Sequence, residues 1–273
     1  MVSTTTMVMM GLTVLICFLV PLGTFYWMRR RYQASVKSFL VGMVMFILMT
    51  QILEGALHLY LLRINSTTAT WLMQPFIYAI YGGLMAGLFE ETGRYLSFKW
   101  LLKKENRIQD ALSYGAGHGG IEAMLIVGTT YLNNLILSVL INQGQLSTLG
   151  FGTELEKSVM TQLTQLSPWV FGLAGYERLM TFVIQIGLSV LVFKAVKEGK
   201  KYWYIVAILI HMLLDIPAAL TQVGVSNLYV VEGIVTVVAA LMVIFIFKQL
   251  KMYHHELSQA EDPELESCQK AGY

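Results

Sequence analysis

The chain has 273 residues, of which 56% are hydrophobic and only 13% are charged, and its formal net charge is +2. Soluble domains carry about 25% charged residues, so this composition excludes an ordinary soluble globular protein and indicates that lipid surrounds much of the surface. The two cysteines, Cys17 and Cys268, are too few and too far apart in the sequence for a disulfide framework or a cysteine-based zinc site.

Seven apolar segments are long enough to cross a bilayer, which takes about 20 residues of helix. The first is too long for the apolar region of a typical signal peptide, and Arg29, Arg30 and Arg31 follow it rather than precede it. We therefore predict an all-α fold, with residues 1–251 forming one membrane bundle of about seven transmembrane helices. The expected spans are roughly 7–28, 38–62, 72–97, 110–141, 168–195, 202–222 and 227–248.

Two polar segments lie outside these spans. The longest loop, at about 142–167, is expected to form a short amphipathic helix on the outer surface in its second half. Residues 252–273 are polar and acidic, and we expect them to form a disordered cytoplasmic tail.

Basic residues gather in every second loop of this arrangement. Positive charge marks the cytoplasmic side of a membrane protein, so we expect the N-terminus outside the cell and the C-terminus in the cytoplasm. Only Arg63 and Lys157 fall on the opposite side. The cytoplasmic basic residues are Arg29, Arg30, Arg31 and Lys37, then Lys99, Lys103, Lys104 and Arg107, then Lys194, Lys197, Lys200 and Lys201, and finally Lys248, Lys251 and Lys270.

Ionisable residues are frequent inside the spans, although a charged group at mid-bilayer costs about 2.5–3.5 kcal/mol on insertion scales. Several form pairs spaced four residues apart, which places both members on one helix face. These pairs are Glu54/His58, Glu90/Arg94, His118/Glu122 and His211/Asp215. Glu91, Glu177, Arg178 and Glu232 also lie inside the spans.

The depths of these groups follow from a rise of about 1.5 Å per residue, counted from the basic helix ends. Glu90 and His118 lie roughly 12 Å, and His211 roughly 14 Å, from the cytoplasmic ends of their spans. We expect one functional cluster at this level, with a separate outer layer that is structural or gating. The cluster comprises Glu90, Glu91, Arg94, His118, Glu122, His211 and Asp215, and the outer layer comprises Glu54, His58, Glu177 and Arg178.

Three segments of this cluster resemble a known family. Residues 90–94, Glu-Glu-Thr-Gly-Arg, resemble the EExxR signature of the CPBP and PrsW-like intramembrane proteases, the superfamily of the type II CAAX prenyl endopeptidases. Residues 117–122 and 211–215 resemble the second and third motifs, and the bacterial YhfC branch also has a pair like Glu177-Arg178. The resemblance covers about 72–222 and implies a multi-pass protein of the bacterial plasma membrane.

The resemblance also implies hydrolysis of peptide bonds within the membrane, on a membrane protein or peptide and not on a nucleic acid. We expect Glu90 to be the general base, with Glu91 as the open alternative. Water activation would involve His118 or Glu122 as well. Arg94 would pair with Glu91 and hold the carboxylates in position.

A set of His and carboxylate side chains suits zinc, which keeps one position open for water in catalytic sites. His211 and Asp215 would complete such a site or stabilise the oxyanion. The ligands of a divalent metal, with zinc as the first candidate, would come from Glu90, His118, Glu122, His211 and Asp215. A metal-free mechanism with a glutamate base is the alternative.

Three other interpretations are open at this point. The pairs spaced four apart could be structural ion pairs or interhelical hydrogen bonds. Intramembrane acids and histidines also form proton relays, so a proton-coupled transporter is the alternative function. A non-catalytic scaffold with the same fold is the third interpretation.

Overall fold

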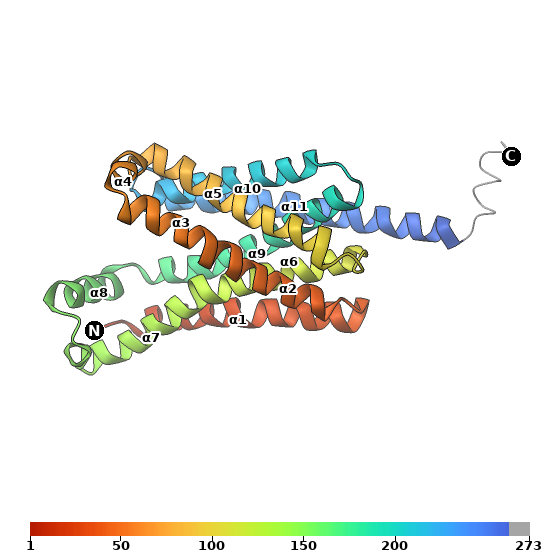
Figure 1. Cartoon of the computed structure of the whole chain (residues 1–273). Helices are drawn as coiled ribbons and strands as arrows, with labels where there is room; N and C mark the ends of the chain where they lie inside the picture. The colour runs from red at the N-terminus through yellow and green to blue at the C-terminus, as the bar shows by residue number, and fades with distance from the viewer. Residues whose placement is uncertain (262–273) are drawn as a thin grey trace.

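The computed structural model of the chain describes residues 1–261, and their side chains as far as Tyr253. The described part consists of helices joined by short connections (Figure 1), as the composition predicts. The helices are α1 Thr4–Tyr32, α2 Val36–Phe46, η1 Ile47–Glu54, α3 Gly55–Leu59, η2 Tyr60–Ile64, α4 Ser66–Leu72, α5 Pro75–Leu96, η3 Ser97–Leu101, α6 Ile108–Glu122, η4 Ala123–Gly128, α7 Thr129–Asn142, η5 Leu146–Leu149, α8 Thr153–Gln165, α9 Pro168–Lys197, α10 Tyr202–Gln222 and α11 Leu228–Glu261.

Six continuous helical stretches of the described chain are long and apolar enough to cross a membrane. A seventh is present if α4 and the stretch Pro75–Leu101 form one span with a bend of 102°. This agrees with the prediction of about seven spans. The bend follows from Pro75, because proline disfavours the helical conformation in the residue before it, and Gln74 is extended with ψ 132°.

The connections that carry the basic residues lie together at one end of the bundle (Figure 1). The N-terminus, α4 and α8 lie at the other end. α8 is the helix expected in the longest loop. α11 continues to Glu261, so the first ten residues of the expected tail, 252–261, are helical, and 262–273 lie outside the described residues.

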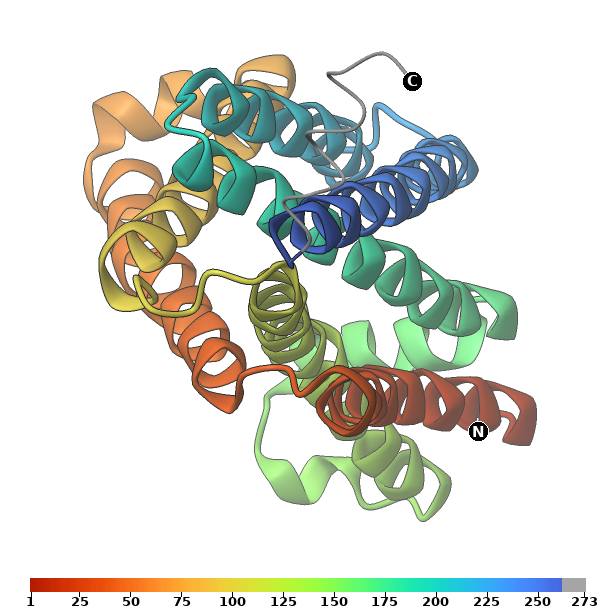
Figure 2. The same cartoon turned by 90° about the vertical axis from the view of Figure 1, so that its right-hand side faces the viewer.

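Two helices lie inside the bundle. Figure 2 views it from the basic end and shows α6 and α9 surrounded by α1, α2, α5, α10 and α11. In the most apolar stretch of α9, 72% of the residues are buried within the protein, the highest share among the candidate spans of the described chain. A polar side chain on α6, or on the part of α9 from Phe182 to Ala195, therefore meets mainly other side chains of the protein.

Glycines bring the helices of the bundle close together. A Cβ atom on Gly83 or Gly87 of α5 would lie 2.7 Å from the backbone oxygen of Met212 or 2.8 Å from that of Ile208, both on α10. Small residues at membrane helix interfaces allow such close approach. The contact between α5 and α10 brings the carboxylates at the end of α5 beside the imidazole of His211.

Candidate active site

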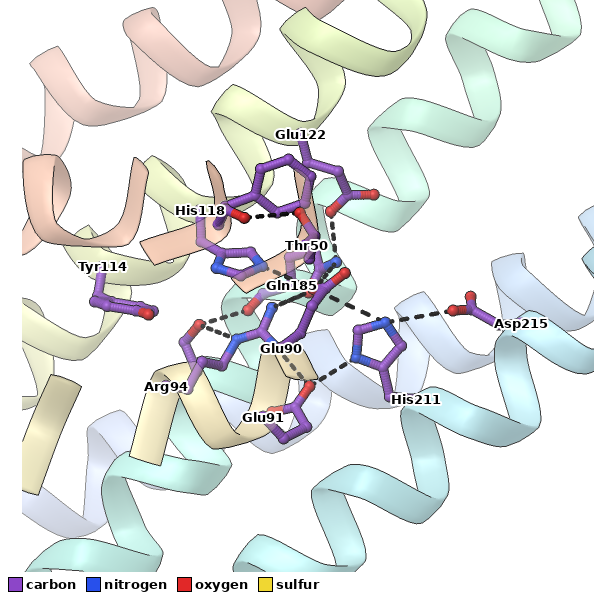
Figure 3. A network of polar contacts seen from close by, with 12 residues as sticks. Thr50, Glu90, Glu91, Arg94, Tyr114, His118, Glu122, Gln185, His211 and Asp215 are labelled. Carbon is purple, nitrogen blue, oxygen red and sulfur yellow. Dashed lines mark hydrogen bonds and ion pairs between the residues drawn. The ribbon is translucent and has the colours of Figure 1, made fainter. Parts of the chain in front are cut away.

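The structure brings the seven predicted cluster residues together between α5, α6, α9 and α10 (Figure 3). Ion pairs and hydrogen bonds link six of them directly, and the seventh, Glu122, joins through Gln185. Helices α5, α6 and α10 supply the seven side chains and α9 supplies Gln185, so the arrangement depends on the packing of four helices. The positions agree with the expected common depth, and the roles of the residues stay predictions.

Glu90 is at the centre of the cluster. Its Oε2 atom lies 2.8 Å from Nε2 of His118, and it accepts a 3.2 Å hydrogen bond from the side-chain amide of Gln185. Nη2 of Arg94 is 3.4 Å away from the same oxygen. Only 7% of Glu90 is exposed, so its carboxylate interacts with protein groups more than with water.

Glu91 has a different environment, although it is the next residue. It is fully buried, and its Oε1 atom lies 2.5 Å from Nη1 of Arg94 and 2.7 Å from Nδ1 of His211. The second nitrogen of His211, Nε2, lies 3.8 Å from Glu90 Oε2 and 3.6 Å from Asp215 Oδ2. A carboxylate on one ring nitrogen fixes the orientation of an imidazole and leaves the other nitrogen for function.

Gln185 of α9 is a central residue that the sequence analysis missed. Its amide nitrogen donates hydrogen bonds to Glu90 Oε2 and, at 2.5 Å, to Glu122 Oε2, while its oxygen accepts one from Arg94. One turn further, Ser189 accepts a 3.2 Å hydrogen bond from Nε of Arg94. Gln185 carries no charge, and its signal in the sequence was an uncharged Gln-x-x-x-Ser pattern on one helix face.

The expected separation into two layers is wrong for Arg178. Nη1 of Arg178 lies 3.0 Å from Oε1 of Glu122, and Nη2 lies 2.5 Å from Oε1 of Glu177. The pair on α9 therefore extends the cluster towards the outer end. Glu54 and His58 lie 3.7 Å apart and make no described ion pair with the cluster, but they line the same cavity.

The cluster borders a cavity of about 530 Å³, a size typical of ligand sites. Glu90, Glu122, His211 and Asp215 line it, whereas Glu91 and Arg94 do not. The side chain of Asp215 is 41% exposed, because it faces this space. The two adjacent glutamates of α5 thus differ in access, since Glu90 reaches the cavity and Glu91 is enclosed.

One part of the cluster could hold a metal ion. Ligand atoms of Glu90, His118 and Glu122 lie within 4.8 Å of one another, and all three residues are buried. The local charge also fits a cation, because the connected network contains more carboxylates than guanidinium groups, and buried charge requires compensation. Its carboxylates belong to Glu90, Glu91, Glu122, Glu177 and Asp215, and its guanidinium groups to Arg94 and Arg178.

Residues 16–235 match the model of a family described as "YhfC intramembrane metalloprotease". The chain belongs to the YhfC family. The matched range contains every residue of the cluster together with Gln185 and the Glu177-Arg178 pair.

A YhfC protein of Bacillus subtilis (strain 168), named "Uncharacterized membrane protein YhfC", is 38% identical over 257 residues. The alignment covers 93% of this chain and 100% of the relative. The similarity therefore extends over the whole bundle, and both proteins belong in a membrane. No solved structure matches the chain.

Proposed function

We propose that this YhfC protein is an intramembrane peptidase in which Glu90 activates the water that attacks a peptide bond. The observation that carries the proposal is the meeting of Glu90, His118 and Glu122, whose ligand atoms lie within 4.8 Å of one another. Glu90 and Glu122 of this group also line the cavity. The description of the family supports the same activity. A carboxylate beside a cavity and within hydrogen-bond distance of an imidazole has the position that general base catalysis requires.

Glu90, His118 and Glu122 would hold the metal ion. Zinc is the proposed ion, because it takes His nitrogen and carboxylate oxygen as ligands. When bound, it would lower the pKa of a water to about 7 and polarise the substrate carbonyl. Nε2 of His118, the nitrogen nearer to Glu90, would be the donor. The carboxylates of Glu90 and Glu122 would supply oxygen ligands. The positive charge of the ion would balance their excess negative charge.

The residues of the chain would divide the proton transfers between them. Glu90, through the carboxylate oxygen that would not hold the ion, takes the proton from the attacking water, whose oxygen forms a bond with the carbonyl carbon. His211, held by Glu91 on Nδ1, directs Nε2 towards Glu90 and Asp215. From there it can donate to the oxyanion or to the nitrogen of the departing amine as the peptide C–N bond breaks.

Gln185 and Arg94 would act as positioning residues. The amide of Gln185 connects Glu90 with Glu122, and Arg94 connects Glu91 with Gln185. These contacts fix both carboxylates before a substrate arrives. Preorganised polar groups of this kind reduce the reorganisation that the reaction requires.

Reconstituted protein tests the proposal. Wild-type protein, Glu90→Gln and His118→Gln would be incubated with a membrane protein extract, and new peptide termini would be identified by mass spectrometry. Glu232→Gln is the matched control, since Glu232 is a buried membrane carboxylate without hydrogen-bond partners for its side-chain oxygens. We expect cleavage by the wild type and the control only. Absence of cleavage by the wild type, together with solute flux driven by a pH gradient, would favour the transporter instead.

A further inference from the structure

We infer that the candidate site is reached from the outer side of the membrane and is closed towards the cytoplasm. If the proposed peptidase activity is correct, its substrates are then extended peptide segments that lie on, or enter from, the outer face. The accessibility itself does not depend on that activity. Three features of the molecule support this access: the course of the cavity, the packing on its other side and the distribution of basic residues.

The cavity extends from the cluster towards the end of the bundle that lies opposite the basic loops. Its inner part is lined by Glu90 and His211. Its outer part is lined by Tyr78, near the start of α5, Gln222, at the end of α10, and His58 of α3. Gln222 is exposed at the surface. The lining therefore runs from buried carboxylates and imidazoles to a solvent-accessible helix end.

On the opposite side of the cluster, tightly packed aromatic rings separate it from the basic end. The ring of Phe98 lies 4.9 Å from that of Tyr114 and 5.5 Å from that of Phe193. Tyr114 is fully buried, and so is Ser97, one turn beyond the cluster on the same chain stretch. Such packing leaves no passage for water from that end of the bundle.

A second hollow at the basic end does not change this conclusion. It has a volume of about 1040 Å³ and lies between α1, α6, α9 and α11. Its walls include Trp27, Ile186 and Phe247, and it shares no lining residue with the cavity of the cluster. It is therefore a separate, mainly apolar groove that does not contain the candidate catalytic groups.

The basic loops assign these two ends to the sides of the membrane. Their clustering at one end of the bundle marks that end as cytoplasmic. The cavity consequently faces outwards, although the cluster lies deep within the bundle. A substrate has to reach deep into the bundle, which an extended chain can do and a folded domain cannot. Segments confined to the cytoplasm, including prenylated C-terminal ends, are excluded from the substrate class.

Side-specific modification of single cysteines tests the inference without a substrate. The background carries Cys17→Ala and Cys268→Ala, and the probe is a charged, membrane-impermeant methanethiosulfonate. Ala86→Cys and Ala218→Cys place small thiols on the cavity wall. Ser97→Cys is a nearly isosteric change in the closed layer. We expect modification of both cavity thiols in intact cells, and no modification of Ser97→Cys in inverted membrane vesicles.

Two exposed positions serve as controls for sidedness. Tyr229→Cys, near the outer start of α11, should react in intact cells, and Lys200→Cys, between α9 and α10, should react in inverted vesicles. The inference is overturned if the two cavity thiols stay unmodified in intact cells, if Ser97→Cys reacts in inverted vesicles, or if the two controls react with reversed sidedness. An inactive protein with the expected modification pattern would reject the peptidase and retain the outward access. An active protein with the opposite modification pattern would retain the peptidase and reject the outward access.

Discussion

Nδ1 of His211 lies 2.7 Å from Oε1 of Glu91, the same oxygen that lies 2.5 Å from Nη1 of Arg94. Glu91 is thus engaged by two partners and enclosed, whereas Glu90 reaches the cavity. This contrast gives the two adjacent glutamates separate roles, which the sequence left undecided. Glu90 is the proposed base, and Glu91 is the proposed support of His211.

Substitution of Glu90 should reduce activity more than stability, whereas substitution of Glu91 should reduce stability. Glu90→Gln removes the base, so we expect the cleavage rate to fall by about 10²–10⁴-fold. The thermal unfolding temperature should stay similar, because the amide retains polar contacts and the excess negative charge decreases.

Glu91→Gln leaves Arg94 without its main partner, which costs about 3–5 kcal/mol for a buried pair. Unfolding in detergent measures the second effect, and an equally stable Glu91→Gln protein would contradict it.

Gln185→Met should reduce metal affinity and the cleavage rate, although Gln185 carries no charge. The change retains the length of the side chain but removes hydrogen bonds to Glu90, Glu122 and Arg94, and each buried group left unsatisfied costs about 1–3 kcal/mol. Outer-shell partners of metal sites typically contribute 10–100-fold to affinity or activity, so we expect a loss of about that size. Metal titration and cleavage rates would measure it. If Gln185→Met behaves like the wild type in both assays, the positioning role is wrong.

Metal analysis should separate the two mechanisms that the site permits. We expect purified wild-type protein to contain zinc, a strong chelator to abolish cleavage, and added zinc to restore it. His118→Gln and Glu122→Gln should lose the metal, whereas Glu232→Gln should keep it. Full activity of a protein without metal, measured by plasma mass spectrometry on the assayed sample, would instead favour a glutamate base acting alone.

The contact between α5 and α10 should be sensitive to side-chain size. Gly87→Val would place a Cβ atom 2.8 Å from the backbone oxygen of Ile208 and force the helices apart. Overpacking typically costs about 1–3 kcal/mol, and we also expect reduced activity, because His211 moves away from Glu91. Gly82→Ala on the same helix is the stability control, since nothing lies within 4 Å of its added Cβ. Equal unfolding temperatures for the two variants would show that the close contact is not required.

Much of the fold follows from the sequence, because a span needs a long apolar segment and charged loops report its direction. The cluster could also be anticipated, since residues four apart share a helix face. The break at Gln74 and Pro75 lies within the expected span 72–97, and Pro75 was its signal in the sequence, which apolar length alone does not show. Counting residues along separate spans also missed the contact of Arg178 with Glu122, which depends on how α6 and α9 pack.

Two further features required the three-dimensional structure. Gln185 carries no charge, so a search for ionisable residues passed over it. Wide π-helical turns, η1 and η4, interrupt the helices next to the site, and one begins directly after Glu122. Such turns often occur at functional sites, but apolar periodicity does not indicate where the hydrogen-bond pattern changes.

Isotope incorporation is a direct test of whether Glu90 activates the attacking water. Wild-type protein and Glu90→Gln would be reconstituted in parallel and incubated with a membrane protein extract in water enriched in ¹⁸O. Mass spectrometry would then detect the isotope in newly formed carboxyl ends. We expect labelled ends with the wild type and a loss of about 10²-fold or more with Glu90→Gln. Equal labelling by both proteins would contradict the assignment of Glu90 as the base, and no labelling above the protein-free control by the wild type would contradict hydrolysis at this site.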